Sequence, residues 1–374
     1  MPQPPIWLFA PDAFKGTLAA AEVAQGLLEG VQSKRPDLEL HSMPMADGGE
    51  GTLEVLHSAL GGTLTDVRVD APRPGGPART ASWLLLPSGT AVVELAACAG
   101  LTLLESVDQD PLMTSTAPLG QLLDAVLAEN VSSLVIGLGG SATVDAGLGA
   151  LQALGANLSV GGRRLDRPCT GGDLLDIESI DLGPVQARVS NLRVHLAVDV
   201  TNPLTGPTGA SRVYGPQKGA DGPAVEHLEA GIRHVATLLG DAGLHPGDGA
   251  AGGVGFGFRL GLAAGIDSGA ALVAGLIGLP AACQSASVVV TGEGCYDDQT
   301  DFGKVPSEIA RLARTGGARS ALVAGRINRS PAALAGDLFE AHVDLVGLSG
   351  DPAVGHRQRL QLAGQRLVDL LAPQ

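Results

Sequence analysis

The sequence predicts an α/β protein built around a mostly parallel sheet. Short apolar runs recur along the 374 residues, glycine and acidic residues follow several of these runs, and segments with helical spacing come after the loops. Strands that alternate with helices in this way are typical of βαβ units. Because a single core seldom grows beyond about 250–300 residues, we expect two domains.

The chain begins with two strand–loop–helix units. Residues 6–10 are apolar, and residues 18–31 carry Ala, Val and Leu at helical spacing behind Thr17, which we expect to be the N-cap. Residues 38–43 form the next strand, and a helix is expected at about 53–60. The polar loops between these elements would lie at the edge of the sheet where open α/β folds bind ligands.

The same pattern returns twice. A strand at 133–138 precedes a helix that reaches about residue 154, and a strand at 287–291 precedes a helix over about 306–315. Pro306 suits the first helical turn, where its missing N–H costs nothing. We expect further strands at 193–198, 320–324 and 343–347 and a last helix over 352–371.

The middle of the chain has a different sequence pattern. Three alternating runs at 64–69, 81–86 and 90–94 resemble antiparallel hairpins, and glycine-rich segments are found at 201–223 and 247–265. We interpret these segments as a second α/β domain inserted into the first, with the active site in the cleft between the two.

Charge and cysteine usage exclude several classes of function. A net charge of −15, from 24 basic and 39 acidic residues, disfavours a nucleic-acid partner, because phosphate neutralisation needs a basic surface. The four cysteines lie far apart without Cys-x-x-Cys spacing, so we expect neither a disulfide framework nor a zinc site. No apolar stretch approaches about 18 residues, so we expect no membrane span and a cytoplasmic location.

The loop after residues 287–291 has the most informative chemistry. Glu293 stands between two glycines, and Asp297, Gln299 and Lys304 follow it. The acids can hold a cation and the lysine can meet an anion, a combination that suits a phosphate group. The sequence has no P-loop here, because the residue five positions before Gly303 is not glycine.

Two other strand ends near the N-terminus carry charged loops. Asp12 and Lys15 follow the first strand, either as a solvated pair or as a site where the lysine binds the carboxylate or phosphate of a small acid. The sequence Asp47-Gly48-Gly49-Glu50 follows the second strand, either as a helix-capping turn or as a substrate or cation site.

Two strand ends in the middle of the chain are also candidates. The loop that contains Gly139 and Gly140 is expected to open a helix whose N–H groups bind phosphate, although a plain tight turn fits equally well. This loop also matches a dinucleotide fingerprint loosely, without the acid expected about 20 residues later. Asp199 is enclosed by valines and needs a partner or a metal, since an unpaired buried charge is costly; a structural acid is the alternative. Lys218 follows on the same long loop.

Taken together, these segments resemble the type I glycerate kinases. Five ordered motifs carry the resemblance, at 10–18, 44–52, 137–149, 199–204 with 215–220, and 291–306. The sequence departs from the family pattern in three places. Val144 and Ala146 replace an Asn and a Gly of the third motif, in which Asp145 is retained, and Cys295 stands where the family commonly has Arg.

The resemblance implies phosphorylation of D-glycerate that depends on ATP and Mg²⁺, most often on the 2-hydroxyl. It also implies a Rossmann-like three-layer domain, formed by 1–65 and 285–374 with part of 110–160, and a second domain at about 66–284. From the chemistry of the residues, our hypothesis is that Lys15, Asp47 and Asp199 are catalytic, with Asp47 as the base or the group that orients the hydroxyl. Asp199 and Glu293 are our candidate metal ligands. The candidate substrate and phosphate ligands are Asp12, Gly48, Gly49, Glu50, Gly139, Gly140, Ser141, Asp145, Asn202, Lys218, Asp297, Gln299 and Lys304.

Other functions stay open from the sequence. The enzyme could be a glycerate 3-kinase or a kinase of another small hydroxy acid. A nicotinamide-dependent dehydrogenase would use the Gly139 loop, and an inactive small-acid sensor would agree with the departures at Val144 and Cys295. We expect neither a nucleic-acid nor a membrane partner, and the oligomeric state is left open, with a homodimer as one option.

Overall fold

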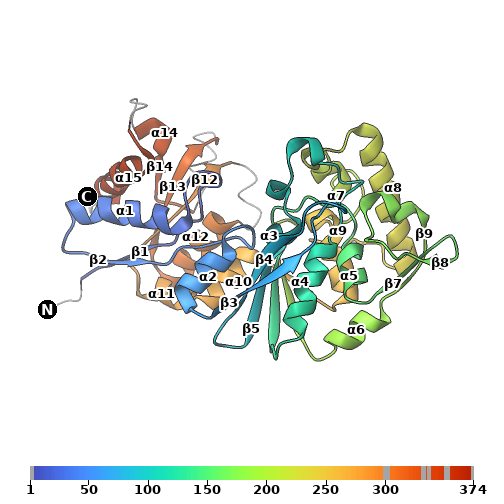
Figure 1. The fold of residues 1–374 in the computed structure, drawn as a ribbon. Coiled ribbons are helices and arrows are strands. Elements are labelled where there is room, and N and C mark those ends of the chain that lie inside the picture. Colours follow the sequence, from blue (N-terminus) through green and yellow to red (C-terminus); the bar gives the residue numbers. More distant parts are fainter. Residues whose placement is uncertain (1–3, 298–303, 330–333, 335–337, 349–353, 372–374) are drawn as a thin grey trace. The chain divides into compact units, whose positions relative to one another are not determined.

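The chain forms two compact units, seen in a computed structural model that describes residues 4–297, 304–329, 334, 338–348 and 354–371 (Figure 1). Unit 1 consists of Met1–Asp47, Glu54–Ala59 and Ser268–Gln374. Unit 2 consists of Gly48–Leu53 and Leu60–Asp267. The α/β class and the parallel sheets predicted from the sequence are confirmed.

The boundaries of the units differ from the expected ones. Residues 110–160, of which part was expected in the Rossmann-like domain, belong to unit 2, because β6 (Ser133–Gly137) pairs there with β5 (Thr90–Glu94) and β10 (Arg193–Ala197). Residues 268–284, expected in the second domain, belong to unit 1, because α10 (Gly269–Leu276) and α11 (Leu279–Ser285) pack against α12 (Val305–Gly316).

Unit 1 contains a five-stranded sheet in which all neighbouring strands are parallel. Its strands are β1 (Ile6–Phe9), β2 (Glu39–Ser42), β12 (Val288–Tyr296), β13 (Arg319–Ile327) and β14 (Ala341–Asp344). Their order in the sheet is β14-β13-β12-β1-β2. From β1 the next strand in sequence, β2, is added on one side of the sheet, whereas β13 and β14 follow β12 on the other side. The switch point lies between β1 and β12, where doubly wound sheets bind ligands.

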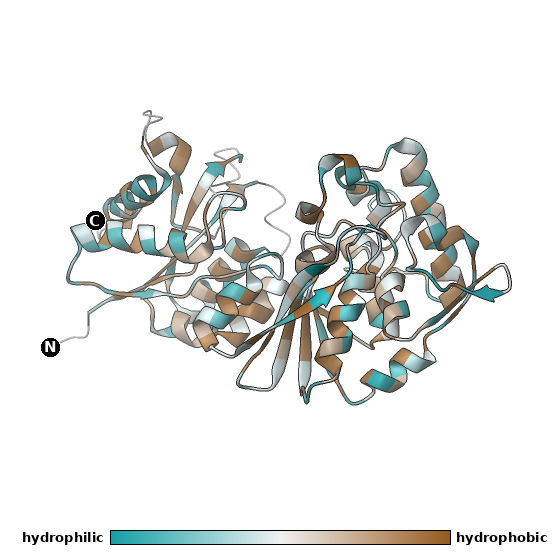
Figure 2. Cartoon of the chain, in the orientation of Figure 1, coloured by the Kyte–Doolittle hydropathy of each residue, from teal (hydrophilic) through white to brown (hydrophobic). Residues whose placement is uncertain are grey.

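Helices cover both faces of this sheet (Figure 1). On one face, α1 (Ala20–Lys34) and α15 (His356–Leu371) form a core with Trp7, Phe9, Val290 and Val323. On the other face, α12 (Val305–Gly316) packs against β12 and β13. Helix α1 alternates between hydrophilic and hydrophobic residues (Figure 2), as expected for a helix with one buried side.

Two local expectations in unit 1 are wrong. Thr17 is not the N-cap of α1, because the helix begins at Ala20 and the backbone N–H of Ala19 donates to the Glu22 carboxylate at 2.9 Å instead. The strand expected at 343–347 ends earlier, and a short helix, α14 (Leu345–Leu348), takes its place.

Unit 2 contains a six-stranded mixed sheet and a small antiparallel sheet. In the larger sheet, β11, β10, β6 and β5 are parallel, and β4 and β3 continue it in antiparallel fashion, as the alternating runs predicted. The order of the small sheet is β8-β7-β9. The remaining strands are β3 (Thr63–Val69), β4 (Arg79–Leu85), β5 (Thr90–Glu94), β7 (Asn157–Val160), β8 (Arg163–Arg164), β9 (Ile177–Asp181), β10 (Arg193–Ala197) and β11 (Gly265–Asp267).

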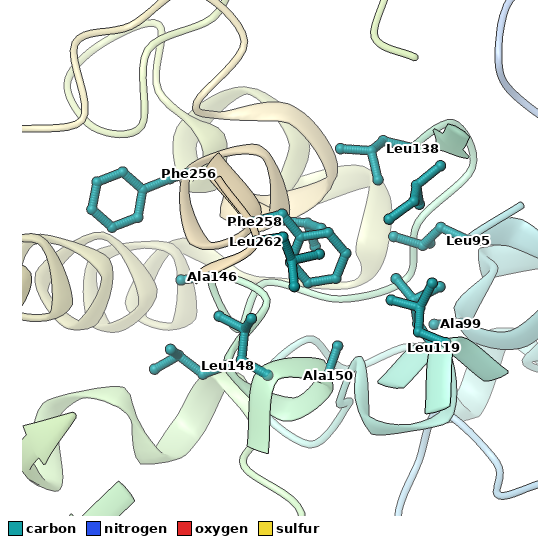
Figure 3. Packing of buried hydrophobic residues seen from close by; sticks show 14 of the residues in the cluster. Leu95, Ala99, Leu119, Leu138, Ala146, Leu148, Ala150, Phe256, Phe258 and Leu262 are labelled. Carbon is teal, nitrogen blue, oxygen red and sulfur yellow. The ribbon is translucent and has the colours of Figure 1, made fainter. Parts of the chain in front are cut away.

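The helices of unit 2 pack around one large apolar core. They are α3 (Ala96–Ala99), α4 (Ala117–Leu127), α5 (Leu148–Ala153), α6 (Gly183–Val189), α7 (Ala210–Tyr214), α8 (Gly222–Leu239) and α9 (Ala250–Gly261); α2 (Thr52–Leu60) begins in unit 2 and continues in unit 1. Figure 3 shows side chains of α4, α5 and α9 in this core, among them Leu119, Leu148 and Phe258. The glycine-rich segment 247–265 is thus largely helical, with non-helical backbone at Ala251, Gly252 and Gly253.

The helix expected directly after Gly140 begins only at Leu148. The Gly139 loop therefore does not present the N-terminus of a helix, which removes the physical basis for a dinucleotide site there. In the described part of the chain, none of the helices combines the length and the apolar character that crossing a bilayer requires.

Candidate active site

A pocket of about 480 Å³ lies in unit 1 at the carboxyl ends of β1 and β12. We call it the switch-point pocket. Its lining comes from the loop after β1, from Asp47 after β2, from the end of β12 and from the first residues of α14 and α15. The lining residues are Asp12, Ala13, Phe14, Lys15, Thr17, Leu18, Asp47, Glu293, Gly294, Cys295, Asp297, Lys304, Gly325, Leu345, Val346, His356 and Arg359.

The backbone of the sheet holds Asp12 in this pocket. The Ala10 N–H donates to Val290 O at 2.7 Å, and the Asp12 N–H donates to Gly292 O at 2.8 Å, so the pairing of β1 with β12 continues beyond the strand. The Asp12 carboxylate is only 8% exposed and accepts a hydrogen bond from the Ala13 N–H at 2.7 Å. It is therefore fixed at the switch point by its own loop.

The pocket concentrates negative charge around one ion pair. Lys15 Nζ lies 2.8 Å from Asp47 Oδ2, with the lysine side chain 69% exposed and the aspartate 15% exposed. The pKa of Asp12 is raised to about 7, chiefly by burial and in addition by the nearby Asp47 and Glu293 carboxylates, while Lys15 and the hydrogen bond from Ala13 oppose the rise. Three acids that repel one another favour a bound cation, which would stabilise their ionised forms.

Other basic side chains line the same pocket. Lys304 is the residue at the N-cap of α12, His356 begins α15, and Arg359 follows one turn later. Cys295 is exposed, and its Sγ accepts from the Asn328 side-chain amide at 3.3 Å. The switch-point pocket thus offers carboxylates for a metal or a hydroxyl and several cations for an anionic ligand.

In unit 2, the segment Gly48–Leu53 lies against the ends of β6 and β10, and glycines permit the close approach. A Cβ on Gly137 would lie 2.1 Å from Gly48 O, and one on Gly139 would lie 2.6 Å from Gly49 Cα. Gly48 has a φ of +86°, and a Cβ there would lie 2.7 Å from that of Ala197. These glycines bring two backbones together, which gives them a structural function.

The end of β5 contributes a buried carboxylate to the same segment. Glu94 Oε1 accepts a hydrogen bond from the Leu53 N–H at 2.7 Å. Burial raises the Glu94 pKa to about 7, and hydrogen bonds from the backbone of Leu53, Gly51 and Thr52 oppose this rise. Because α2 begins at Thr52, Glu94 caps its N-terminus from a distant strand.

The loop after β6 rests on two buried charged residues. Asp145 accepts hydrogen bonds from the Thr116 N–H and hydroxyl, both at 2.7 Å, and from the N–H groups of Gly147 and Gly149. Lys218 is buried and donates to Thr143 O at 2.7 Å and to Ser141 Oγ at 3.3 Å. Burial lowers the Lys218 pKa to about 7, against the attraction of Asp145.

Comparison with known proteins identifies the family. The model of the glycerate kinase family matches residues 7–360. The chain belongs to the glycerate kinase family. It is 38% identical to the glycerate kinase of Bacillus subtilis over 332 residues, which cover 86% of this chain and 85% of that protein. It is also 38% identical to the glycerate 2-kinase of Escherichia coli over 315 residues, or 82% and 81% of the two chains.

A solved structure supports the same family. The crystal structure of a putative glycerate kinase 2 from Salmonella typhimurium matches with a TM-score of 0.84 and 32% sequence identity, over 98% of both chains. As a member of the glycerate kinase family, the protein is a phosphotransferase.

The switch-point pocket of this glycerate kinase family member brings together six residues that the sequence nominated. They are Asp12, Lys15, Asp47, Glu293, Asp297 and Lys304. Gln299 lies outside the described residues. Two residues that the sequence did not nominate, His356 and Arg359, also line the pocket. They lie within the helix expected over 352–371, so a search for polar loops directly after strands did not reach them.

The other nominated residues belong to unit 2, namely Gly48, Gly49, Glu50, Gly139, Gly140, Ser141, Asp145, Asp199, Asn202 and Lys218. Asp145 and Lys218 are buried and make internal hydrogen bonds, and their role in phosphate binding stays a prediction. Asn202 supports its own loop, donating to Thr208 O at 2.8 Å and accepting from the Tyr214 hydroxyl at 2.7 Å.

The expected metal ligands do not share a unit. Asp199 is half-buried after β10 in unit 2, whereas Glu293 lies in unit 1. Among the described residues, no group of three or more His, Cys, Asp and Glu side chains is arranged to hold a metal ion.

Two departures from the family pattern have a structural explanation. Val144 and Ala146 are fully buried in the core of unit 2, where Ala146 adopts a φ of +53°. Their side chains pack against apolar neighbours. Cys295, by contrast, lines the switch-point pocket.

Proposed function

We propose that the protein transfers the terminal phosphate of ATP to the 2-hydroxyl of D-glycerate with the help of Mg²⁺, forming 2-phosphoglycerate. The observation that carries this proposal is the switch-point pocket, in which carboxylates and cations converge in a chain of the glycerate kinase family. Phosphoryl transfer depends mostly on positioning and charge neutralisation, and these side chains are suited to both.

Lys15 and Asp47 would handle the small acid. Lys15 is largely exposed and can meet the glycerate carboxylate, while its ion pair holds Asp47 in one orientation. Asp47 would accept the hydrogen bond of the reacting hydroxyl and orient it toward the phosphate. Lys304 and Arg359, which line the same pocket, would neutralise phosphate oxygens.

The residues present suit Mg²⁺. Carboxylate oxygens are its preferred protein ligands, and one or two of them suffice when phosphate oxygens and water complete the shell. The mutual repulsion of Asp12, Asp47 and Glu293 is what a divalent cation would relieve. Glu293 is our candidate ligand in unit 1, and Asp199 is our candidate in unit 2. When bound, the ion would neutralise charge on the transferred phosphoryl group.

The test is a coupled assay that reports the position of phosphorylation. The protein is incubated with ATP, Mg²⁺ and D-glycerate, and enolase is added without phosphoglycerate mutase. Formation of phosphoenolpyruvate is the expected result, because enolase accepts 2-phosphoglycerate. ADP release without phosphoenolpyruvate would point to the 3-phosphate. No turnover with D-glycerate or with other small hydroxy acids would refute the proposal.

A further inference from the structure

We propose that Glu94 is a positioning residue of the kinase, which fixes the turn Gly48–Leu53 on the sheet of unit 2. This inference rests on the proposed function. Glu94 touches neither the switch-point pocket nor any residue nominated as a ligand of the metal, and it would act only through the turn.

The position of Glu94 in the sheet gives it a rigid base. It is the last residue of β5, it is buried, and it pairs with Gly137 of β6. The next residue, Leu95, donates its N–H to Gly137 O at 2.9 Å. A carboxylate anchored in this way has little freedom, so the groups that bind it are held in place as well.

The carboxylate binds the turn at one end. Leu53 donates to Glu94 Oε1 at 2.7 Å, and the N–H groups of Gly51 and Thr52 also face it. The first N–H groups of a helix have no partner within the helix, and a local Ser, Thr, Asp or Asn commonly supplies one. Here the Thr52 hydroxyl donates instead to Gly49 O at 2.8 Å, which leaves the capping to Glu94.

The other end of the turn is held by shape. Gly137, Gly139 and Ala197 fit so closely against Gly48 and Gly49 that the turn cannot move toward the sheet. These contacts do not prevent movement away from the sheet, whereas the hydrogen bonds to Glu94 do. The two ends together define one position for the turn.

This turn carries part of the second motif. Glu50 lies on the turn and is exposed, and Asp47 directly precedes it in the chain. Misplacing a catalytic group by about 1 Å can cost roughly 100-fold in rate. A loosened turn should therefore lower kcat by more than a loss of stability explains.

The test compares Glu94→Ala and Glu94→Gln with Asp173→Asn as the matched control. Asp173 is also a buried acid that caps a helix, since it accepts from the Thr170 N–H at 2.9 Å, but it lies in the Arg167 ion pair away from the turn. Steady-state kinetics is measured well below each Tm, and hydrogen exchange is followed in peptides that contain residues 48–53.

We expect Glu94→Ala to lower kcat at least about 10-fold and to accelerate exchange in the turn. Glu94→Gln keeps an acceptor for the Leu53 N–H, so its kcat and its exchange rate in the turn should stay close to those of the wild type. Asp173→Asn should lower Tm without changing kcat or the exchange rate in the turn. Unchanged kcat and exchange in Glu94→Ala would overturn the inference. If Glu94→Ala does not fold, Glu94→Gln provides the test. Fast exchange in the turn of Glu94→Gln together with a wild-type kcat would overturn the inference. An inactive wild type would refute the proposed function, and the exchange data would still decide whether Glu94 fixes the turn.

Discussion

The ionisation of Glu94 should make unit 2 less stable as the pH rises through the neutral range. The folded protein holds the Glu94 proton up to about pH 7, whereas the unfolded chain releases it near the ordinary value of 4.5. Between these two values the folded state binds more protons, so raising the pH favours unfolding. Glu94→Gln has no proton to lose and should lack this part of the pH dependence.

The size of the effect follows from the two pKa values. At pH 5 the proton linkage of Glu94 disfavours folding by about 1 kcal/mol relative to strong acid, and at pH 8 by roughly 3 kcal/mol. The wild type should thus lose roughly 2–3 kcal/mol of unfolding free energy between pH 5 and pH 8 that Glu94→Gln does not lose. The hydrogen bond from Leu53 remains in both proteins, because a glutamine oxygen can accept it.

The assay is urea unfolding at both pH values, followed by the fluorescence of Trp83. The chain has two tryptophans, and Trp83 is buried in β4 of unit 2, so a Trp7→Phe background makes the signal specific to this unit. For each protein, the free energy of unfolding at pH 8 is subtracted from that at pH 5, and the results for wild type and Glu94→Gln are then compared. The comparison requires that the m-value stays constant. A difference below about 0.5 kcal/mol would show that burial does not raise the Glu94 pKa as described.

Four further predictions concern the turn and the switch-point pocket. Gly137→Ala would place a methyl carbon 2.1 Å from the backbone oxygen of Gly48. Differential scanning fluorimetry should therefore show a lower Tm, and the coupled assay a lower kcat. Gly222→Ala is the control, because no atom lies within 4 Å of the added carbon. Asp47→Asn should lower kcat about 100-fold or more in steady-state kinetics, and wild-type turnover would eliminate Asp47 as the base. Lys15→Met should raise the KM for D-glycerate about 10-fold, and the difference from wild type should be smaller at high salt because salt screens the interaction of Lys15 with the carboxylate. An unchanged KM would exclude a contact between Lys15 and the glycerate carboxylate. Cys295→Arg adds a cation to the pocket and should lower the KM for the anionic substrate or for ATP, and a raised KM for both would contradict this.

The strand ends of unit 1 could be predicted because local sequence determines them. Each apolar run there is followed by its polar loop, and parallel strands bring such loops to one edge, which is how Asp12, Asp47 and Glu293 were found. Their common pocket requires only that the strands be neighbours. The sequence order of the motifs and the resemblance to a family agreed with that arrangement.

The role of a residue was harder to predict where a distant backbone determines it. Gly139 carries the same sequence signal whether it binds phosphate or lets another backbone approach, and the approach of Gly49 to it is visible only in the structure. Glu94 looks like the end of an ordinary strand until Leu53, 41 residues away, donates to it. Asp145 and Lys218 follow the family motif, but their burial reflects the packing of α5, α9 and the loop around them.

The discontinuity of unit 1 has a consequence during synthesis of the chain. Strand β1 lies between two neighbours in its sheet, yet one of them, β12, begins 282 residues after β1 begins, with all of unit 2 translated in between. At a translation rate of about 5–20 residues per second, β1 is synthesised on the order of 15–60 s before β12 and lacks this neighbour during that time. Unit 2 is complete by then and can fold first. We expect the nascent N-terminal segment, with Trp7 and Phe9 exposed, to be the part of this chain that most needs protection from aggregation.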